Sequence, residues 1–256
     1  MFLRESAALR RAAWACQQLG ADTVTAPVMD LRDPGPEDYR ALNRAIDRLA
    51  HYYDWVVLTS QEGVERFVTQ CEIRSQKPIG DHPQFAVVGR QTETALRRHG
   101  IRVSLAPLSD FSQQGLIDAL GKLPKLSGER FLLPLADQAR SLLEHFLAQH
   151  GAVVERLVLY RTVFLSLDPK AARHLADGAI DGIFYTSPSS VQAFCQNLGP
   201  NLYRRFQDAP AFSIGDQTSR VLANHAVTSI MQAPTASIPA LVEVAVSFFG
   251  TRSPGP

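Results

Sequence analysis

The chain has 256 residues, 45% of them hydrophobic, and its 26 basic and 25 acidic residues leave a formal net charge of +1. This near balance, without a long run of one sign, gives no electrostatic reason to expect nucleic acid or a membrane surface as a partner. Cys16, Cys71 and Cys195 lack the paired spacing of a zinc site or a redox dithiol, which favours a reduced, cytoplasmic setting. No apolar run is long enough to span a bilayer, and the N-terminal residues lack the apolar core of a signal peptide. We therefore expect a soluble protein.

The first part of the chain predicts a very short strand at 1–3, a helix that stops before Gly20, and a second strand at 22–26. The sequence Pro34-Gly35-Pro36 then breaks the chain and is a candidate hinge. A helix is predicted over 38–51, because its apolar residues fall on one face.

Two longer blocks share one pattern, in which a short apolar run ends in hydroxyl or glycine residues and then becomes helical. The matching segments are 55–67 with 182–194, and 85–92 with 211–218. Ser60 matches Ser187 at an offset of 127, and Thr92 matches Thr218 at an offset of 126. A buried parallel strand that leads into a helix has this pattern. Two similar α/β lobes are the simplest explanation.

A shorter block is also repeated, because 130–160 resembles 1–27 in its order of strand, helix, glycine stop and strand. The blocks could be paired in tandem, or interleaved so that the first short block completes the last long one. The residues themselves leave both arrangements open. The remaining predicted features are an internal loop at 78–83, a helix at 170–176, a closing helix at 239–249 and a loose tail at 251–256.

The repeated hydroxyl residues fall where ligands bind in open α/β sheets, at the carboxyl ends of the strands, where the next helices present free N–H groups. These residues are Ser60, Thr92, Ser187 and Thr218. A serine or threonine at such a junction is usually only a helix cap, so a single one carries little weight. Four of them, facing a cleft between lobes, suit a substrate with several carboxylates.

Familiar catalytic signatures are missing from the sequence. It contains no Gly-x-Ser-x-Gly elbow, no phosphate loop with lysine, no Gly-x-Gly-x-x-Gly and no His-Glu-x-x-His. The seven histidines are not spaced with Cys or Asp as metal ligands would be. We therefore expect neither a metal site nor a redox cofactor.

Several short segments, taken together and in order along nearly the whole chain, resemble the uroporphyrinogen-III synthase family. They are Tyr160 within Leu-Val-Leu-Tyr-Arg-Thr, the Thr-Ser-x-x-x-Val segments at 59 and 186, the Gly-x-x-Thr segments at 89 and 215, and the Ala-Pro pairs at 106 and 233. Arg4 falls where that family has Thr-Arg-Pro after its first strand, with Glu5 in place of the proline. Asp216 also departs from the family, which commonly has proline there, and an acid beside a site for carboxylates would repel them unless it faces away.

The resemblance implies the interleaved arrangement. Two similar α/β lobes with parallel, flavodoxin-like sheets would be joined by two extended strands and would enclose an interlobe cleft. One lobe would comprise 1–30 plus 166–256, and the other 32–164.

The resemblance also implies an activity, the cofactor-free cyclisation of the linear tetrapyrrole hydroxymethylbilane with inversion of its D ring, which is a hydro-lyase reaction. Tyr160 would be the catalytic proton donor. The substrate-binding residues carried over are Arg4, Ser60, Thr92, Ser187 and Thr218. The expected partners are the small-molecule substrate and a transient contact with hydroxymethylbilane synthase, with no nucleic acid and no membrane, and the protein would be a cytoplasmic monomer.

Two other functions compete with this interpretation. A two-lobed sensor that closes on a small polycarboxylate needs the same strand-end donors but not the Tyr160 hydroxyl. A hydrolase of acidic sugars or amino acids ranks last, because the sequence shows no convincing carboxylate pair or nucleophile.

Overall fold

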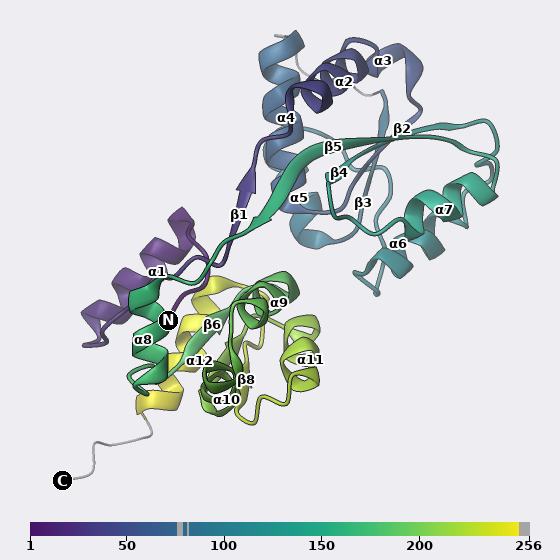
Figure 1. Ribbon diagram of the computed structural model, residues 1–256. Coiled ribbons are helices and arrows are strands. Elements are labelled where there is room, and N and C mark those ends of the chain that lie inside the picture. Colours follow the sequence, from purple (N-terminus) through teal and green to yellow (C-terminus); the bar gives the residue numbers. More distant parts are fainter. Residues whose placement is uncertain (76–78, 81, 251–256) are drawn as a thin grey trace. The chain divides into compact units, whose positions relative to one another are not determined.

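The computed structural model describes residues 1–75, 79–80 and 82–250 (Figure 1). The predicted loop at 78–83 lies partly, and the predicted tail at 251–256 wholly, outside the described residues. Contacts between residues divide the chain into two compact units. The first combines Met1–Asp30 with the chain from Val163 onward, and the second is Leu31–Thr162. We call them the terminal unit and the central unit.

The central unit is built on a sheet in which β5 (Val153–Phe164), β4 (Arg130–Ala136), β2 (Trp55–Leu58) and β3 (Gln84–Val87) follow one another, with β1 (Met29–Arg32) outside β5. The pairs β4–β5, β2–β4 and β2–β3 are parallel. Its helices are α2 (Pro36–Asp47), α3 (Leu49–Tyr52), α4 (Gln61–Ser75), α5 (Arg90–Arg98), α6 (Gln113–Leu120) and α7 (Leu142–Gln149).

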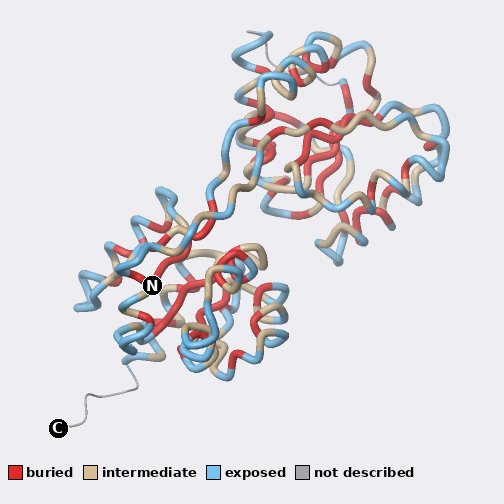
Figure 2. The backbone as a smooth tube through the Cα atoms, viewed as in Figure 1, coloured by how far each residue is buried: buried red, intermediate tan, exposed pale blue. Residues whose placement is uncertain are grey.

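The strands β2, β3 and β4 are buried along most of their length, whereas β5 and β1 are mostly intermediate or exposed (Figure 2). On β2, Val56 and Leu58 join a core with α2, α4 and α5, whereas Trp55 and Val57 join a core with α6 and α7. Successive residues of a strand point to opposite faces, so an entirely apolar strand serves two cores at once. This explains why 55–58 is a continuous apolar run rather than an alternating one.

The terminal unit has a smaller parallel sheet of β6 (Ile183–Tyr185), β7 (Ala211–Ser213) and β8 (Ile230–Gln232), extended by a bridge between Phe2 and Phe184. The Phe2 and Phe184 rings stack with centroids 4.4 Å apart, which fixes the N-terminal segment on the sheet. Its helices are α1 (Ala7–Gln18), α8 (Pro169–Ala176), α9 (Pro188–Gln196), α10 (Pro200–Asp208), α11 (Asp216–Asn224) and α12 (Ile238–Gly250).

The predicted fold class, two α/β units with parallel strands, is confirmed, but several elements differ. The predicted strands at 1–3 and 22–26 are only isolated bridges at Phe2 and Thr25, because the chain bends directly after Phe2 and enters α1, which leaves one residue to pair. The predicted helix at 38–51 begins earlier, at Pro36, and is divided in two at Arg48. Proline suits the first helical position, so the predicted break is in fact a helix start.

Described residues from both ends of the sequence, 1–30 and 163–250, belong to the terminal unit. The lobe boundaries implied by the resemblance, 1–30 plus 166–256 and 32–164, stay a prediction. In the part of the chain that the structure describes, no helix combines the length and apolar character needed to cross a membrane.

Gly115 provides a test of packing in the central unit. A Cβ there would lie 1.8 Å from the backbone carbonyl oxygen of Asp110, whereas one at Gly121, just after the same helix, would make only ordinary contacts of 3.5 Å or more. We expect Gly115→Ala to destabilise the protein by about 1–3 kcal/mol and Gly121→Ala by about 0.5 kcal/mol or less. Thermal melts of the two variants measure the difference, and equal melting temperatures would contradict the packing described.

Candidate functional site

The carboxyl edge of the central sheet presents two helix N-termini side by side. Leu58 of β2 pairs in register with Val87 of β3, and each strand leads within a few residues into a helix, α4 after Ser60 and α5 after Gly89. In a parallel sheet the ends of neighbouring strands meet at one edge, so the first turns of both helices begin there, with their N–H groups directed out of the helix.

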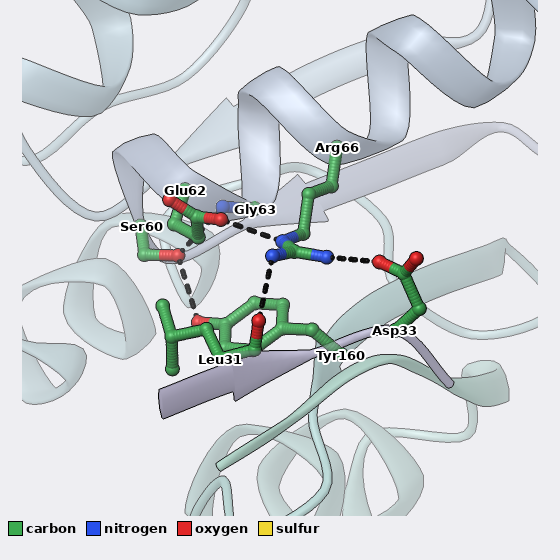
Figure 3. A network of polar contacts seen from close by, with 7 residues as sticks. All are labelled: Leu31, Asp33, Ser60, Glu62, Gly63, Arg66 and Tyr160. Atoms are coloured by element: carbon green, nitrogen blue, oxygen red, sulfur yellow. Dashed lines mark hydrogen bonds and ion pairs between the residues drawn. The ribbon is translucent and has the colours of Figure 1, made fainter. Parts of the chain in front are cut away.

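Tyr160, on β5, reaches the same edge and meets Ser60. The Tyr160 phenol oxygen lies 3.3 Å from Ser60 Oγ, which also accepts a 2.9 Å hydrogen bond from the Gly63 N–H (Figure 3). Ser60 therefore both caps α4 and contacts the phenol. Of the residues predicted for this unit, the structure brings these two into direct contact, and Tyr160 is half-buried rather than enclosed in the core.

Arg66 completes this arrangement, although the sequence analysis did not identify it. It donates from Nε to Glu62 at 2.6 Å, from Nη1 to Asp33 at 2.6 Å and from Nη2 to the Leu31 carbonyl oxygen at 3.1 Å. Its guanidinium carbon lies 5.5 Å from the centre of the Tyr160 ring, within the range of a cation–π contact (Figure 3). Burial disfavours the charged form of Arg66, but its bonds to Glu62 and Asp33 outweigh that cost and raise its pKa.

A hollow of about 380 Å³ borders Arg66. Its lining includes the acids Asp33, Glu62 and Glu65, together with Tyr39. Burial, followed by the charge of Asp33, raises the pKa of Tyr39. Arg66 also lines the hollow and pairs with two of these acids, so three carboxylates stand against one cation, which makes the hollow unsuited to a substrate with many carboxylates. It is not the predicted site.

The second corner of this edge carries a cation. Arg90, the first residue of α5, is exposed, and its guanidinium lies 5.0 Å from the centre of the Phe111 ring. It forms no ion pair with any residue that the structure describes. Phe111 in turn packs over Gly89, where a Cβ would approach the Phe111 Cβ to 3.2 Å. Thr92, predicted as a substrate-binding hydroxyl, is only 4% exposed and belongs to the packed side of α5.

The terminal unit repeats this geometry around its own sheet. Ser187 is the N-cap of α9, with its Oγ accepting from the Ser190 N–H at 3.2 Å and lying 3.0 Å from Ser189 Oγ. Tyr185 and Ser213 pair at the ends of β6 and β7, so the N-termini of α9 and α11 open at one edge. Thr218, in α11, is only 2% exposed. Its side chain, like that of Thr92, is packed inward.

Arg4 lies near this same edge, because it follows two residues after Phe2, which bridges in parallel to Phe184, one residue before the end of β6. Its side chain is half-buried. It has no hydrogen bond or ion pair to the described part of the protein. The structure thus places Arg4, Ser187 and Thr218 at the carboxyl edge of one unit, and Ser60, Thr92 and Tyr160 at that of the other.

Asp216, the acid that departs from the family pattern, forms an ion pair. Its carboxylate lies 2.8 Å from the guanidinium of Arg220, one turn later on α11. The matched position in the central unit, at an offset of 126, is Arg90. The two equivalent corners therefore differ in charge, with an arginine outside any described ion pair in one and an acid paired with arginine in the other.

The signal that could have revealed Arg66 was the repeat itself. At the offset of 127, Arg66 corresponds to Ala193, whereas Ser60 and Phe67 match Ser187 and Phe194. In the sequence, Glu62 and Arg66 have only the spacing of an ordinary surface ion pair on a helix, so nothing there indicated the contacts of Arg66 with Asp33, Leu31 and Tyr160. Within the described ranges, no group of three His, Cys, Asp or Glu side chains is arranged to hold a metal ion.

Comparisons with known proteins agree with one another. The family model described as uroporphyrinogen-III synthase HemD matches residues 10–243. A relative in Methanothermobacter thermautotrophicus, named for the same synthase, is 31% identical over 218 residues, which cover 82% of this chain and 83% of the relative. A uroporphyrinogen-III synthase of Chlorobaculum parvum is 23% identical over 187 residues, 72% of each chain.

Solved structures show the same fold. A mutant uroporphyrinogen III synthase of Thermus thermophilus aligns with a TM-score of 0.70 at 18% identity, covering 98% of this chain and 97% of that one. The enzyme of Helicobacter pylori aligns with a TM-score of 0.55 at 18% identity, covering 89% and 94%. Because the family model spans most of the chain and the first relative exceeds 30% identity, this protein belongs to the uroporphyrinogen-III synthase family.

Proposed function

We propose that this protein is a uroporphyrinogen-III synthase that cyclises hydroxymethylbilane to uroporphyrinogen III with inversion of the D ring. The reaction is the loss of one water molecule: the terminal hydroxyl leaves, an azafulvene cation and then a spiro intermediate form, and the ring closes. It balances without an oxidant or a reductant, so it requires no redox cofactor. The observation that carries the proposal is the Tyr160 phenol in contact with Ser60 at the carboxyl edge of the central sheet.

The hydrogen bonds of Ser60 suit Tyr160 as the proton donor to the leaving hydroxyl. Because the Gly63 N–H already occupies one lone pair of Ser60 Oγ, the Ser60 O–H can donate to the phenol oxygen. The phenol O–H is then free to point toward substrate. General acid catalysis needs such a proton within reach of the departing group.

The substrate carries eight carboxylates, which the strand ends can bind through many separate donors. We assign the anion contacts at Ser60 and Ser187 to the hydroxyls and the adjacent first-turn N–H groups. At Thr92 and Thr218, whose side chains are buried, we assign them to the helix N-termini that these residues help to pack. Arg4 and Arg90 add positive charge at two of the corners.

The remaining expectations complete the proposal. The two functional lobes would be 1–30 plus 166–256 and 32–164, and would hold the flexible substrate between them so that ring closure is positioned rather than left to chance. We further propose a cytoplasmic monomer that meets hydroxymethylbilane synthase only transiently. A non-enzymatic sensor is disfavoured, because the relatives and solved structures that match along the chain are synthases by name.

Tyr160→Phe tests the catalytic assignment. Loss of the phenolic proton should lower kcat by about 10²- to 10⁴-fold with little change in KM, because ring and shape are retained. The assay adds freshly generated hydroxymethylbilane and separates the type III from the type I isomer by chromatography. Wild-type protein that yields only type I, the product of spontaneous closure, would refute the proposed function, and an unimpaired Tyr160→Phe would refute the role of the phenol.

Ser60 and Ser187 are equivalent helix caps, so comparing their alanine variants distinguishes an effect on stability from an effect on catalysis. Each accepts a hydrogen bond from a first-turn N–H, so Ser60→Ala and Ser187→Ala should each cost about 1 kcal/mol of stability. Only Ser60 contacts Tyr160, and we expect only its loss to lower kcat, by roughly tenfold, the factor that follows from losing one hydrogen bond of about 1.4 kcal/mol. Equal kcat values for the two variants would show that the Ser60–Tyr160 contact has no role.

Arg90 tests the charge at the second corner. Arg90→Glu should raise KM roughly tenfold with kcat retained, and the effect should shrink at high salt, because it removes a cation that attracts carboxylates. Arg97→Glu on the same helix is the control. Arg97 lies in the last turn of α5, at the end opposite Arg90, and forms an ion pair with Glu93. If both variants raise KM equally, general surface charge rather than this corner attracts the substrate.

A further inference from the structure

Arg66 is held more firmly than an ordinary surface arginine. Its three nitrogens donate separately to Glu62 on the same helix, to the Leu31 carbonyl oxygen on β1, and to Asp33 directly after that strand. The side chain is 24% exposed. Because each donor has a different partner, the guanidinium plane has little freedom to turn.

This fixed plane borders the Tyr160 ring. The guanidinium carbon lies 5.5 Å from the ring centre, while the phenol oxygen of the same residue meets Ser60 (Figure 3). Ser60 and Arg66 stand at the start and in the second turn of α4. The tyrosine is thus constrained twice from one helix, at its hydroxyl and at its ring.

The charge of Arg66 is largely neutralised by its neighbours. Two carboxylates, Glu62 and Asp33, lie 2.6 Å from its nitrogens. The arginine therefore acts on Tyr160 through the placement of its guanidinium more than through a net positive charge. This separates the role of Arg66 from that of a substrate-binding cation such as Arg90.

The repeat shows that this constraint belongs to one unit only. Ala193 occupies the matched position on α9, and the cap that it follows, Ser187, contacts Ser189 rather than a tyrosine. An arginine is therefore not required for a helix to pack after such a strand. It is present where the catalytic tyrosine is.

We propose that Arg66 is a positioning residue for the reaction, which holds the Tyr160 ring so that its hydroxyl stays at Ser60 and faces the substrate. The expected effect on kcat rests on the proposed function. The expected effect on the placement of the Tyr160 ring does not. Through Asp33 and Leu31, the same contacts link the placement of the tyrosine to β1 and the segment that leads out of it.

The kinetic test is a double-mutant cycle between Arg66 and Tyr160. Arg66→Gln should lower kcat roughly five- to thirtyfold, a loss of about 1–2 kcal/mol in the positioning of the phenol, and change KM less than about twofold. In a Tyr160→Phe background the same substitution should have almost no further effect, because Arg66 acts through that hydroxyl. Independent, multiplicative losses would overturn the proposal.

Two further variants distinguish positioning from charge and from stability. Arg66→Lys keeps a cation but not the three-way planar set of donors, so we expect it to resemble Arg66→Gln; full recovery would show that charge alone matters. Arg161→Gln removes a comparable ion pair, with Asp38 at 2.6 Å, from the residue next to Tyr160. Arg161→Gln should retain kcat. A loss of kcat equal to that of Arg66→Gln would show that losing any ion pair of this kind, rather than the contact with Tyr160, lowers kcat.

A measurement independent of activity keeps the two proposals separate. In protein with ring-labelled tyrosine, the NMR signal that disappears in Tyr160→Phe should shift or broaden in Arg66→Gln and stay in place in Arg161→Gln. An unshifted signal in Arg66→Gln overturns the inference, whatever the enzyme does. Wild-type protein that forms only the type I isomer overturns the proposed function, whatever the tyrosine signal does.

Discussion

The structure depends on the alignment of parallel strand ends. In each unit, strands that pair in register stop together, and the helices that follow begin at one edge, where the first-turn N–H groups have no acceptor further back in their own helix. That edge favours anions before any side chain is considered, because the N–H groups and the helix dipoles carry partial positive charge. The continuous apolar runs at 55–58 and 183–185 make this possible, since only strands buried on both faces hold helices so closely over them.

Side chains then make the two edges different. The central edge has Tyr160, held by Ser60 and Arg66, together with Arg90 at its second corner. The terminal edge has Ser187, with Asp216 paired to Arg220 where the central unit has Arg90. The two edges therefore share one backbone geometry, and the contact between a tyrosine and the helix-capping serine is found in the central unit. Under the proposed function, both edges would bind substrate carboxylates, and the central edge alone would supply the proton donor.

The two α/β units and their strand ends could be predicted from the sequence, because the same local pattern of apolar and hydroxyl residues occurs in both. The offsets that relate Ser60 to Ser187 and Thr92 to Thr218 located the strand ends correctly. The predictions of short strands at 1–3 and 22–26 were wrong. The sequence of such a segment does not show whether the chain forms a strand or only a bridge at one residue. Arg66 was missed because its partners Leu31 and Asp33 lie more than 30 residues away, beyond the reach of any spacing rule. The burial of Thr92 and Thr218 depends likewise on packing that a motif does not record.

Hydrogen exchange with and without the cyclic product uroporphyrinogen III tests the central claim most directly, because it reports on backbone N–H groups themselves. Product should slow exchange in the first turns of the helices that begin near 60, 90, 188 and 216, and leave their last turns unchanged. Protection elsewhere, with those four turns unaffected, would contradict an account in which the strand-end edges hold the tetrapyrrole.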